Sequence, residues 1–431
     1  MKRDVKQGLE KDPAGAAGTP DGWVAAVQLT ERWLARSERV DALLEGLTPA
    51  LAPRERARAQ HLFYGVVRWA GRLETALVGL MAHPPRTKVR AVLHVAGFEL
   101  LEGGADATAQ IVHHAVGKAK NVASPKEAGL VNAVARKLAG RLAEKPASLA
   151  EEFAHPDWLV ARWEKQFGRE VTRQLLEWNQ RAAPVYARWR DPAAPVPDFL
   201  APTNWPGFFE VKAGRWDEVR RLAAAGALYV QDPSTRLSVE LLAPQPDECV
   251  LDCCAAPGGK SLLIADTMKT GRLVALDEPG GRLDRLKENL TRAPQGVTVS
   301  LAQADLRAVA SPFYRQLNLP ETYDAVLLDA PCSNTGVMRH RVDVKWRLQE
   351  GDFAQHGRQQ LELLHAAARM VRPGGRLVYS TCSIDAQENE QVSKAFFDSR
   401  AGGPFKLERS ALAYPWKDGH DGVGAFLLRK S

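Results

Sequence analysis

The chain has 431 residues, 45% hydrophobic and 25% charged, a composition that excludes a disordered or fibrous protein and leaves room for two or three domains. No apolar run approaches the ~20 residues of a membrane-spanning helix, and the first residues lack the apolar core of a secretory signal, so we expect a cytoplasmic protein without a membrane partner. Lysine and arginine outnumber aspartate and glutamate, 58 against 51, which favours a polyanionic partner.

The N-terminal third predicts helices. Residues 1–22 mix charges with glycine, alanine and proline, and we expect them to form a flexible tail. Residues 23–146 carry apolar residues at helical spacing, beginning with Val24 and Val27, and show no β-like alternation of any length. An all-α domain is therefore predicted. Its later helices are expected at 72–81, 88–101, 109–122 and 127–142.

The remaining chain divides into two parts. Residues 147–244 contain helix-like segments and then short strands rich in proline, so they are predicted to form a small, mixed α/β connecting region. Residues 245–431 alternate short apolar runs with helical stretches, which predicts βαβ units and a mostly parallel, doubly wound sheet. Ligands bind such sheets at the carboxyl ends of the strands.

The first predicted strand of this sheet, ECVLD, runs directly into a loop that contains a glycine pair. The loop consists of Cys254, Ala255, Ala256, Pro257, Gly258, Gly259 and Lys260. Glycines between a strand and a helix let the backbone approach a ligand closely. The loop is not a P-loop, because Cys254 stands where that motif needs glycine, and it lacks the G-x-G-x-x-G pattern of a nicotinamide site.

Aspartates end the strands that follow. Asp277 closes the run GRLVALD, where a carboxylate can accept hydrogen bonds from ribose hydroxyls. Asp305 lies just after the third predicted strand, within reach of an adenine amino group, and Asp329 ends the fourth. One such aspartate would usually cap a helix or fill a turn, but several at successive strand ends indicate a ligand site.

Five cysteines form no C-x-x-C pair and no zinc-ligand spacing with histidine, so neither a metal site nor a disulfide framework is predicted. Cys332 in DAPCS and Cys382 in STCS each follow a predicted buried strand, on the rim that would hold the ligand. A cysteine is ordinarily buried filler, but these two have Pro, Ser and Thr neighbours at strand exits, which favours chemistry. The residues alone do not rank the two thiols.

Three segments resemble the signature motifs of the RNA 5-methylcytosine methyltransferases: LDCCAAPGGKS, DAPCSNTGVMRHRVDVKWR and YSTCSIDAQENE. The segments FYGVVRW, VLHVAGFELL and LVNAVARKL are similar to the NusB-like RNA-binding domain. The pairing resembles the Sun (RsmB-type) 16S ribosomal RNA cytosine methyltransferases over nearly everything beyond the tail. It implies an all-α NusB-like N-terminal domain and a Rossmann-like methyltransferase domain at the C-terminus.

The resemblance also implies roles. S-adenosylmethionine would bind the loop 254–260, with Asp277 at the ribose, Asp305 by the adenine and Asp329 facing both methionine and target base. The family's nucleophile lies in the T-C-S motif, here Cys382, and the P-C cysteine, here Cys332, would help product release. A thiolate that adds to carbon 6 of cytosine makes carbon 5 able to attack a methylsulfonium, which splits one difficult step into easier ones.

Three departures from the family's pattern bear on recognition of the base. Asn334 replaces the usual glycine of P-C-S-G-T-G, Arg341 and Val342 replace a frequent His-Pro pair, and the C-terminal HDGVGAFLLRK lacks a common double Phe. None of them is a predicted catalytic residue, so we expect activity to survive.

RNA would be held as a single strand or with the target base flipped out. Candidates to grip phosphates or stack on bases are Arg339, His340, Arg341, Lys345, Trp346 and Arg347, with a solvated basic loop as the alternative. Arg54, Arg56, Arg58, Arg68 and Arg72 offer a second basic face, or ordinary helix surface. We expect 16S ribosomal RNA as the substrate and a monomer.

Three alternatives stay open. The same chemistry could act on transfer RNA, because the NusB-like domain argues for ribosomal RNA by analogy only. A DNA cytosine methylase would use Cys332 as its nucleophile and would not need Cys382. A non-catalytic RNA-binding assembly factor would need neither thiol, and the presence of Cys332, Cys382 and Asp329 argues against it.

Overall fold

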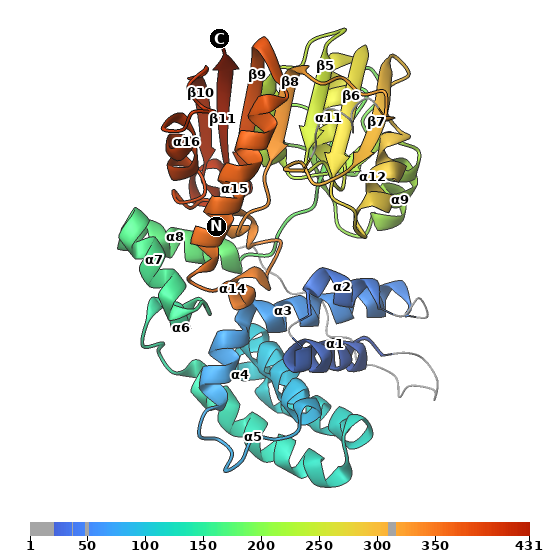
Figure 1. The fold of residues 1–431 in the computed structure, drawn as a ribbon. Coiled ribbons are helices and arrows are strands. Elements are labelled where there is room, and N and C mark those ends of the chain that lie inside the picture. The colour runs from blue at the N-terminus through green and yellow to red at the C-terminus, as the bar shows by residue number, and fades with distance from the viewer. Residues whose placement is uncertain (1–20, 37, 48–50, 309–315) are drawn as a thin grey trace. The chain divides into compact units, whose positions relative to one another are not determined.

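The computed structural model describes residues 21–36, 38–47, 51–308 and 316–431 (Figure 1). The chain divides into two compact units, Met1–Val160 and Ala161–Ser431. Among the described residues, no helix is both long enough and apolar enough to cross a bilayer. Residues 1–20 of the predicted tail lie outside the described residues, and the four-part division drawn from the sequence stays a prediction.

The described part of the first unit is helical, as predicted. Its helices are α1 (Gly22–Arg36), α2 (Val40–Glu45), α3 (Pro53–Leu77), α4 (Thr87–Val122), α5 (Pro125–Ala143) and α6 (Leu149–Glu152). Trp23, Leu73 and Leu138 are fully buried in the shared core. Gly104, with a φ of +67°, interrupts α4 between the two helices that the sequence predicts there.

The second unit begins with helices and a small antiparallel sheet. The elements are α7 (Asp157–Phe167), which crosses the unit boundary, α8 (Arg169–Gln180), β1 (Tyr186–Trp189), β2 (Leu200–Pro202), β3 (Phe208–Val211), α9 (Trp216–Ala224), β4 (Leu228–Val230), η1 (Pro233–Thr235) and α10 (Arg236–Leu242). The strand order is β2-β3-β1-β4. Arg188 and Arg190 both form ion pairs with Asp266, on the first helix of the large sheet, at 2.6 and 2.7 Å. The small sheet is therefore fastened to the large one within one unit.

The large sheet confirms the predicted doubly wound topology. Its elements are β5 (Cys249–Cys253), α11 (Gly259–Met268), β6 (Gly271–Asp277), α12 (Leu283–Leu290), β7 (Val297–Gln303), β8 (Tyr323–Asp329), η2 (Thr335–Val337), α14 (Val344–Arg347), α15 (Asp352–Arg369), β9 (Val371–Thr381), α16 (Glu390–Phe397), β10 (Phe405–Ala413), α17 (Pro415–Asp418) and β11 (Val423–Lys430). The strand order is β10-β11-β9-β8-β5-β6-β7, and the five strands from β9 to β7 are parallel (Figure 1).

Helices cover both faces of this sheet. Val326 and Leu328 of β8 pack in one core with α15 and α16, whereas Ala325 and Leu327 pack in another with α10 and α11. The chain runs outward from β5 through β6 and β7, then returns to β8 on the other side of β5. That reversal is the topological switch point at which doubly wound sheets bind ligands.

Candidate active site

The predicted cofactor loop lies at the end of β5, where the backbone turns sharply into α11. Cys254 has a φ of +59° and Gly258 a φ of +104°. A Cβ atom on Gly258 would lie 3.0 Å from Leu286 of α12, and one on Gly259 would lie 2.9 Å from the ring of Tyr229. The sequence suggested that the glycines allow a ligand to approach; the positive φ of Gly258 and the close side chains at both positions also favour glycine here.

Two of the predicted aspartates meet this loop. Asp277, buried at the end of β6, accepts a hydrogen bond from the backbone N of Ala256 at 2.7 Å. Asp329, at the end of β8, accepts one from Lys260 Nζ at 2.6 Å and another from Ser380 Oγ at 2.8 Å. The strand ends and the loop therefore form one site, as the topology predicts.

Asp252 joins this group, and the sequence analysis did not single it out. It is buried near the end of β5 and accepts a hydrogen bond of 2.5 Å from Ser261 Oγ, while its Oδ1 has no hydrogen-bond partner within the described part of the chain. Burial raises the pKa of Asp252 to about 7, against the lowering effect of the Ser261 hydrogen bond, and the nearby carboxyl of Asp329 raises it further. Its position at a strand end, like that of the other aspartates, was the available signal.

Negative charge surrounds the loop. Burial raises the pKa of the Cys254 thiol, and the carboxyls of Asp277, Asp329 and Asp252 raise it further. Lys260 also lies among these groups. A site of this composition attracts a cationic ligand.

Asp305, the third predicted aspartate, is paired with a neighbouring arginine. Arg307 donates to both of its carboxylate oxygens, with distances of 2.9 Å from Nε to Oδ1 and 2.8 Å from Nη2 to Oδ2, and this hydrogen bonding lowers the pKa of Asp305. Arg307 also reaches Glu278, which directly follows Asp277, at 3.4 Å. The structure therefore links Asp305 to the site through an arginine and not by direct contact.

The two predicted thiols lie together. Cys332 Sγ and Cys382 Sγ are 3.1 Å apart, at the exits of the neighbouring strands β8 and β9. Cys332 is buried, and Cys382 is half-buried. The hydrogen bond with Cys382 and burial together raise the pKa of the Cys332 thiol well above its ordinary value. Either thiol of the pair can donate to the other, and the Cys382 thiol also has an acceptor in Asn334 Oδ1 at 3.4 Å.

A buried carboxylate fastens the two cysteine loops to each other. Glu388, which is fully buried, accepts hydrogen bonds from the backbone N of Ser333 at 2.9 Å and from Ser383 Oγ at 2.6 Å. The Ser333 hydroxyl and Gln360 Nε2 donate to the same carboxylate. Each serine directly follows one of the cysteines, so Glu388 sets the separation of the two thiols.

A second buried carboxylate anchors the Cys382 loop to α7. Asp385 accepts hydrogen bonds from Arg162 Nε at 2.6 Å and from Thr335 Oγ1 at 2.9 Å. Burial raises the pKa of Asp385, and the pairing with Arg162 opposes that shift. Gln166, one turn further along α7, donates to the backbone O of Ile384 at 3.0 Å.

The C-terminal loop closes the arrangement by direct backbone contact. The backbone N of Gly336 donates to the carbonyl of Cys382 at 2.9 Å, and the N of Gly422 donates to the carbonyl of Gly336 at 2.8 Å. A Cβ atom on Gly336 would lie 2.7 Å from the carbonyl oxygen of Cys382, so only glycine fits. His340 Nδ1 lies 3.0 Å from Asp421 Oδ1 and joins the same two loops.

The basic segment after Cys332 packs against the protein. Arg339 donates to the carbonyl of Ala182 at 2.7 Å, and its guanidinium lies 4.3 Å from the ring centre of Trp178. Lys345 is buried, and Arg347 pairs with Asp343 at 2.8 Å. Arg341 is exposed. Arg339 and Arg347 therefore have protein partners, whereas the exposed Arg341 fits the alternative of a solvated loop.

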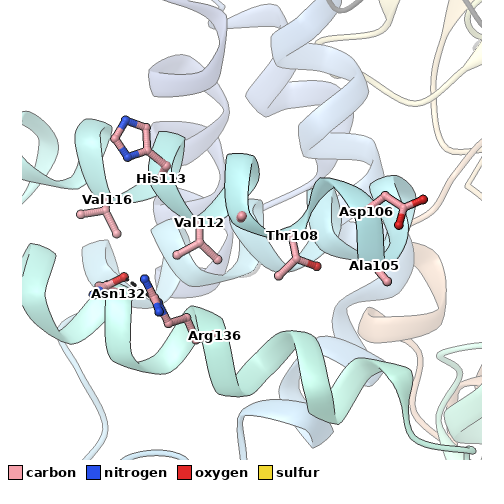
Figure 2. A pocket seen from close by; sticks show the side chains of 9 residues that line it. Ala105, Asp106, Thr108, Val112, His113, Val116, Asn132 and Arg136 are labelled. Atoms are coloured by element: carbon pink, nitrogen blue, oxygen red, sulfur yellow. Dashed lines mark hydrogen bonds between the residues drawn. The ribbon is translucent and has the colours of Figure 1, made fainter.

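The helical unit has its own cavity of about 550 Å³ beside α4 and α5 (Figure 2). Arg136 and Asn132 of α5 face Val112 and Val116 of α4 across it, and Arg136 Nε donates to Asn132 Oδ1 at 3.3 Å. None of the predicted site residues lines it. Of the second basic face, Arg58 lies 3.9 Å from Glu99, and Arg72 donates to the carbonyl of Leu142 at 2.8 Å.

Two known families match separate parts of the chain. The family described as 16S rRNA methyltransferase RsmB/F matches residues 239–411, and the NusB family matches residues 24–140. The second match falls on the helical unit and the first on the doubly wound sheet. The protein is therefore a methyltransferase with a helical NusB domain.

Similar proteins extend the match over most of the chain. Ribosomal RNA small subunit methyltransferase B of Vibrio cholerae is 33% identical over 88% of this chain and 91% of its own length. The protein of the same name from Klebsiella pneumoniae is 32% identical over 86% and 88%. The crystal structure of PH0851 shares the fold with a TM-score of 0.76, at 23% identity over 96% of this chain and 99% of that one. The chain belongs to the ribosomal RNA small subunit methyltransferase B family.

Proposed function

We propose that the protein transfers a methyl group from S-adenosylmethionine to carbon 5 of a cytosine in 16S ribosomal RNA, through a covalent bond between Cys382 and the cytosine. The pair of sulfur atoms carries this proposal, because two thiols 3.1 Å apart at neighbouring strand exits suit attack and release on one base. The matched family and the named relatives support ribosomal RNA as the substrate class.

The residues around the cofactor loop fit S-adenosylmethionine. This cofactor supplies the methyl group as a sulfonium and carries an ammonium, so it is cationic at its reactive end. Asp277 and Asp329 provide the negative surroundings, and Oδ1 of Asp252, which has no hydrogen-bond partner among the described residues, is a buried acceptor for a donor on the ligand. Asp277 would bind the ribose, and Asp305 would reach an adenine amino group once Arg307 releases one of its oxygens.

Three residues of the chain have separate roles in the proposed reaction. The Cys382 thiolate adds to carbon 6 of the cytosine, and carbon 5 then takes the methyl group. Asp329 would accept a hydrogen bond from the amino group of the cytosine and so orient the ring, and its salt bridge with Lys260 holds it in place. A base removes the proton from carbon 5, the bond from carbon 6 to sulfur breaks, and Cys332 assists the departure of Cys382.

Alanine variants of the two cysteines test this division. Cys382→Ala should abolish transfer of labelled methyl groups to small-subunit RNA. Cys332→Ala should accumulate a covalent protein–RNA adduct, seen as a shifted band on a denaturing gel, because product release is slowed. Cys249→Ala, at the start of β5, is the matched control and should behave as wild type.

The outcomes separate the alternatives. Full activity of Cys382→Ala together with an inactive Cys332→Ala would replace this proposal with the DNA-methylase type of nucleophile. Methyl transfer to transfer RNA but not to ribosomal RNA would keep the chemistry and overturn the substrate. Bisulfite sequencing of ribosomal RNA from a deletion strain then locates the cytosine.

A further inference from the structure

Asn334 brings a side chain to a position where the family's motif usually has glycine. It lies two residues after Cys332 and has a φ of +62°, in the left-handed region that glycine favours. Asparagine is among the few other residues that adopt this conformation at low cost. The backbone can therefore keep the conformation that glycine would adopt there. The side chain adds a partly buried amide beside the two thiols.

Both ends of this amide contact the cysteines. Asn334 Nδ2 donates to the carbonyl oxygen of Cys332 at 2.7 Å, and the thiol of Cys382 donates to Asn334 Oδ1 at 3.4 Å. The opposite orientation of the amide would place two oxygen atoms against each other at 2.7 Å, so the contact with Cys332 fixes which end meets Cys382.

The two neighbours of the Cys382 sulfur act in opposite directions. Because the hydrogen of the Cys382 thiol points to Asn334, the Cys332 thiol is the donor between the two sulfur atoms, and a donor favours the thiolate of Cys382. Asn334 Oδ1 can only accept, so it favours the protonated thiol and repels the negative sulfur. Cys382 lies between a group that activates it and a group that restrains it.

We propose that Asn334 caps Cys382 in the free protein, holding the nucleophile as a thiol until the amide turns away and the sulfur gives up its proton to solvent. The inference rests on the proposed function in one respect, that Cys382 is the nucleophile. The motif's usual glycine has no group that could form this cap.

Alkylation of Cys382 by iodoacetamide tests the cap on the whole protein, without RNA or cofactor. The thiolate displaces iodide, so the rate follows the fraction of deprotonated sulfur. Mass spectrometry of the Cys382 peptide gives that rate across the pH range in which thiols ionise. Asn334→Gly should accelerate alkylation about threefold to tenfold, because the hydrogen bond that holds the thiol is lost.

Two further variants sharpen the result. Asn334→Asp brings a negative charge near the same sulfur, although its carboxylate must turn away from the carbonyl oxygen of Cys332, and should slow alkylation below the wild-type rate. Asn318→Gly makes the same exchange at another left-handed asparagine, with a φ of +52°, and should leave the rate unchanged. An Asn334→Gly protein that folds normally and is alkylated at the wild-type rate or more slowly overturns the cap.

Failure of the proposed function would look different. If methyl transfer persists in Cys382→Ala, Cys382 is not the nucleophile. The cap would then have no role in catalysis, whatever the alkylation rates are. Faster alkylation of Asn334→Gly together with an inactive Cys382→Ala supports both.

Discussion

Replacement of Glu388 by alanine should loosen the two cysteine loops at once. Its carboxylate accepts from the backbone N of Ser333 and from Gln360, and also from the hydroxyls of Ser333 and Ser383, all in a buried environment. Without Glu388, the two hydroxyls, which lie 3.3 Å apart, can form a hydrogen bond with each other, and Gln360 Nε2 still donates to the carbonyl oxygen of Pro331. The backbone N of Ser333 has no such substitute.

The expected loss of stability follows from the hydrogen bonds of Glu388 that nothing else can replace. One buried amide left without an acceptor costs about 1–3 kcal/mol, and the cavity and weakened hydroxyl contacts add to it, so we expect a loss of about 2–4 kcal/mol. For a unit of this size that lowers the melting temperature by about 4–16 °C, measured by calorimetry. Methyl transfer should fall as well, because the sulfur pair is no longer held.

The exposed Glu390, two residues further on, supplies the matched control, and Glu390→Ala should melt within a degree or two of wild type. If Glu388→Ala melts as the wild-type protein does, the buried network does not support the cysteine loops.

Two other predictions concern the cofactor and pH. Asp277→Asn should weaken binding of S-adenosylmethionine at least about tenfold in calorimetry, since a hydrogen bond to a carboxylate is lost while the asparagine oxygen still accepts from Ala256; Asp284→Asn, exposed on α12, is the control, and equal affinities would exclude Asp277 from the ribose site. Burial lowers the pKa of His340, but the hydrogen bond and charge of Asp421 outweigh it, so that pKa lies above the ordinary 6.5. Burial also raises the pKa of Asp421, so the charged pair is present at mildly acidic pH, above the pKa of Asp421, and is lost as the pH rises through the raised pKa of His340. The melting temperature of wild type should exceed that of His340→Gln at mildly acidic pH and converge with it at high pH; a constant difference would contradict the charged pair.

The strand-end residues show what the sequence could predict. Parallel strands end at the same edge of a sheet, so Asp277, Asp329, Cys332 and Cys382 were expected on one rim before their partners were known. Their spacing was not predictable, because it depends on β8 and β9 being neighbours, and the order of strands is a tertiary property.

Other determinants lay beyond sequence reasoning. Glu388 lies within a quoted motif, but a glutamate in a polar segment is ordinarily exposed, and only the packing shows that it is buried. Arg162 contacts Asp385 across 223 positions of chain, a separation at which no local pattern indicates a pair. The C-terminal segment HDGVGAFLLRK was interpreted only as a motif. The structure shows that it contains a buried antiparallel strand, β11.

The anchorage of Asp385 on α7 limits how the enzyme can be trimmed. A fragment cut at residue 245 would contain every strand of the large sheet, yet it would bury a carboxylate whose guanidinium had been removed with Arg162. It would also leave Asp266 without the two arginines that follow α8. An uncompensated buried charge costs about 3–5 kcal/mol, so the smallest excisable catalytic piece must start before α7, and any chimera must inherit both segments from one parent.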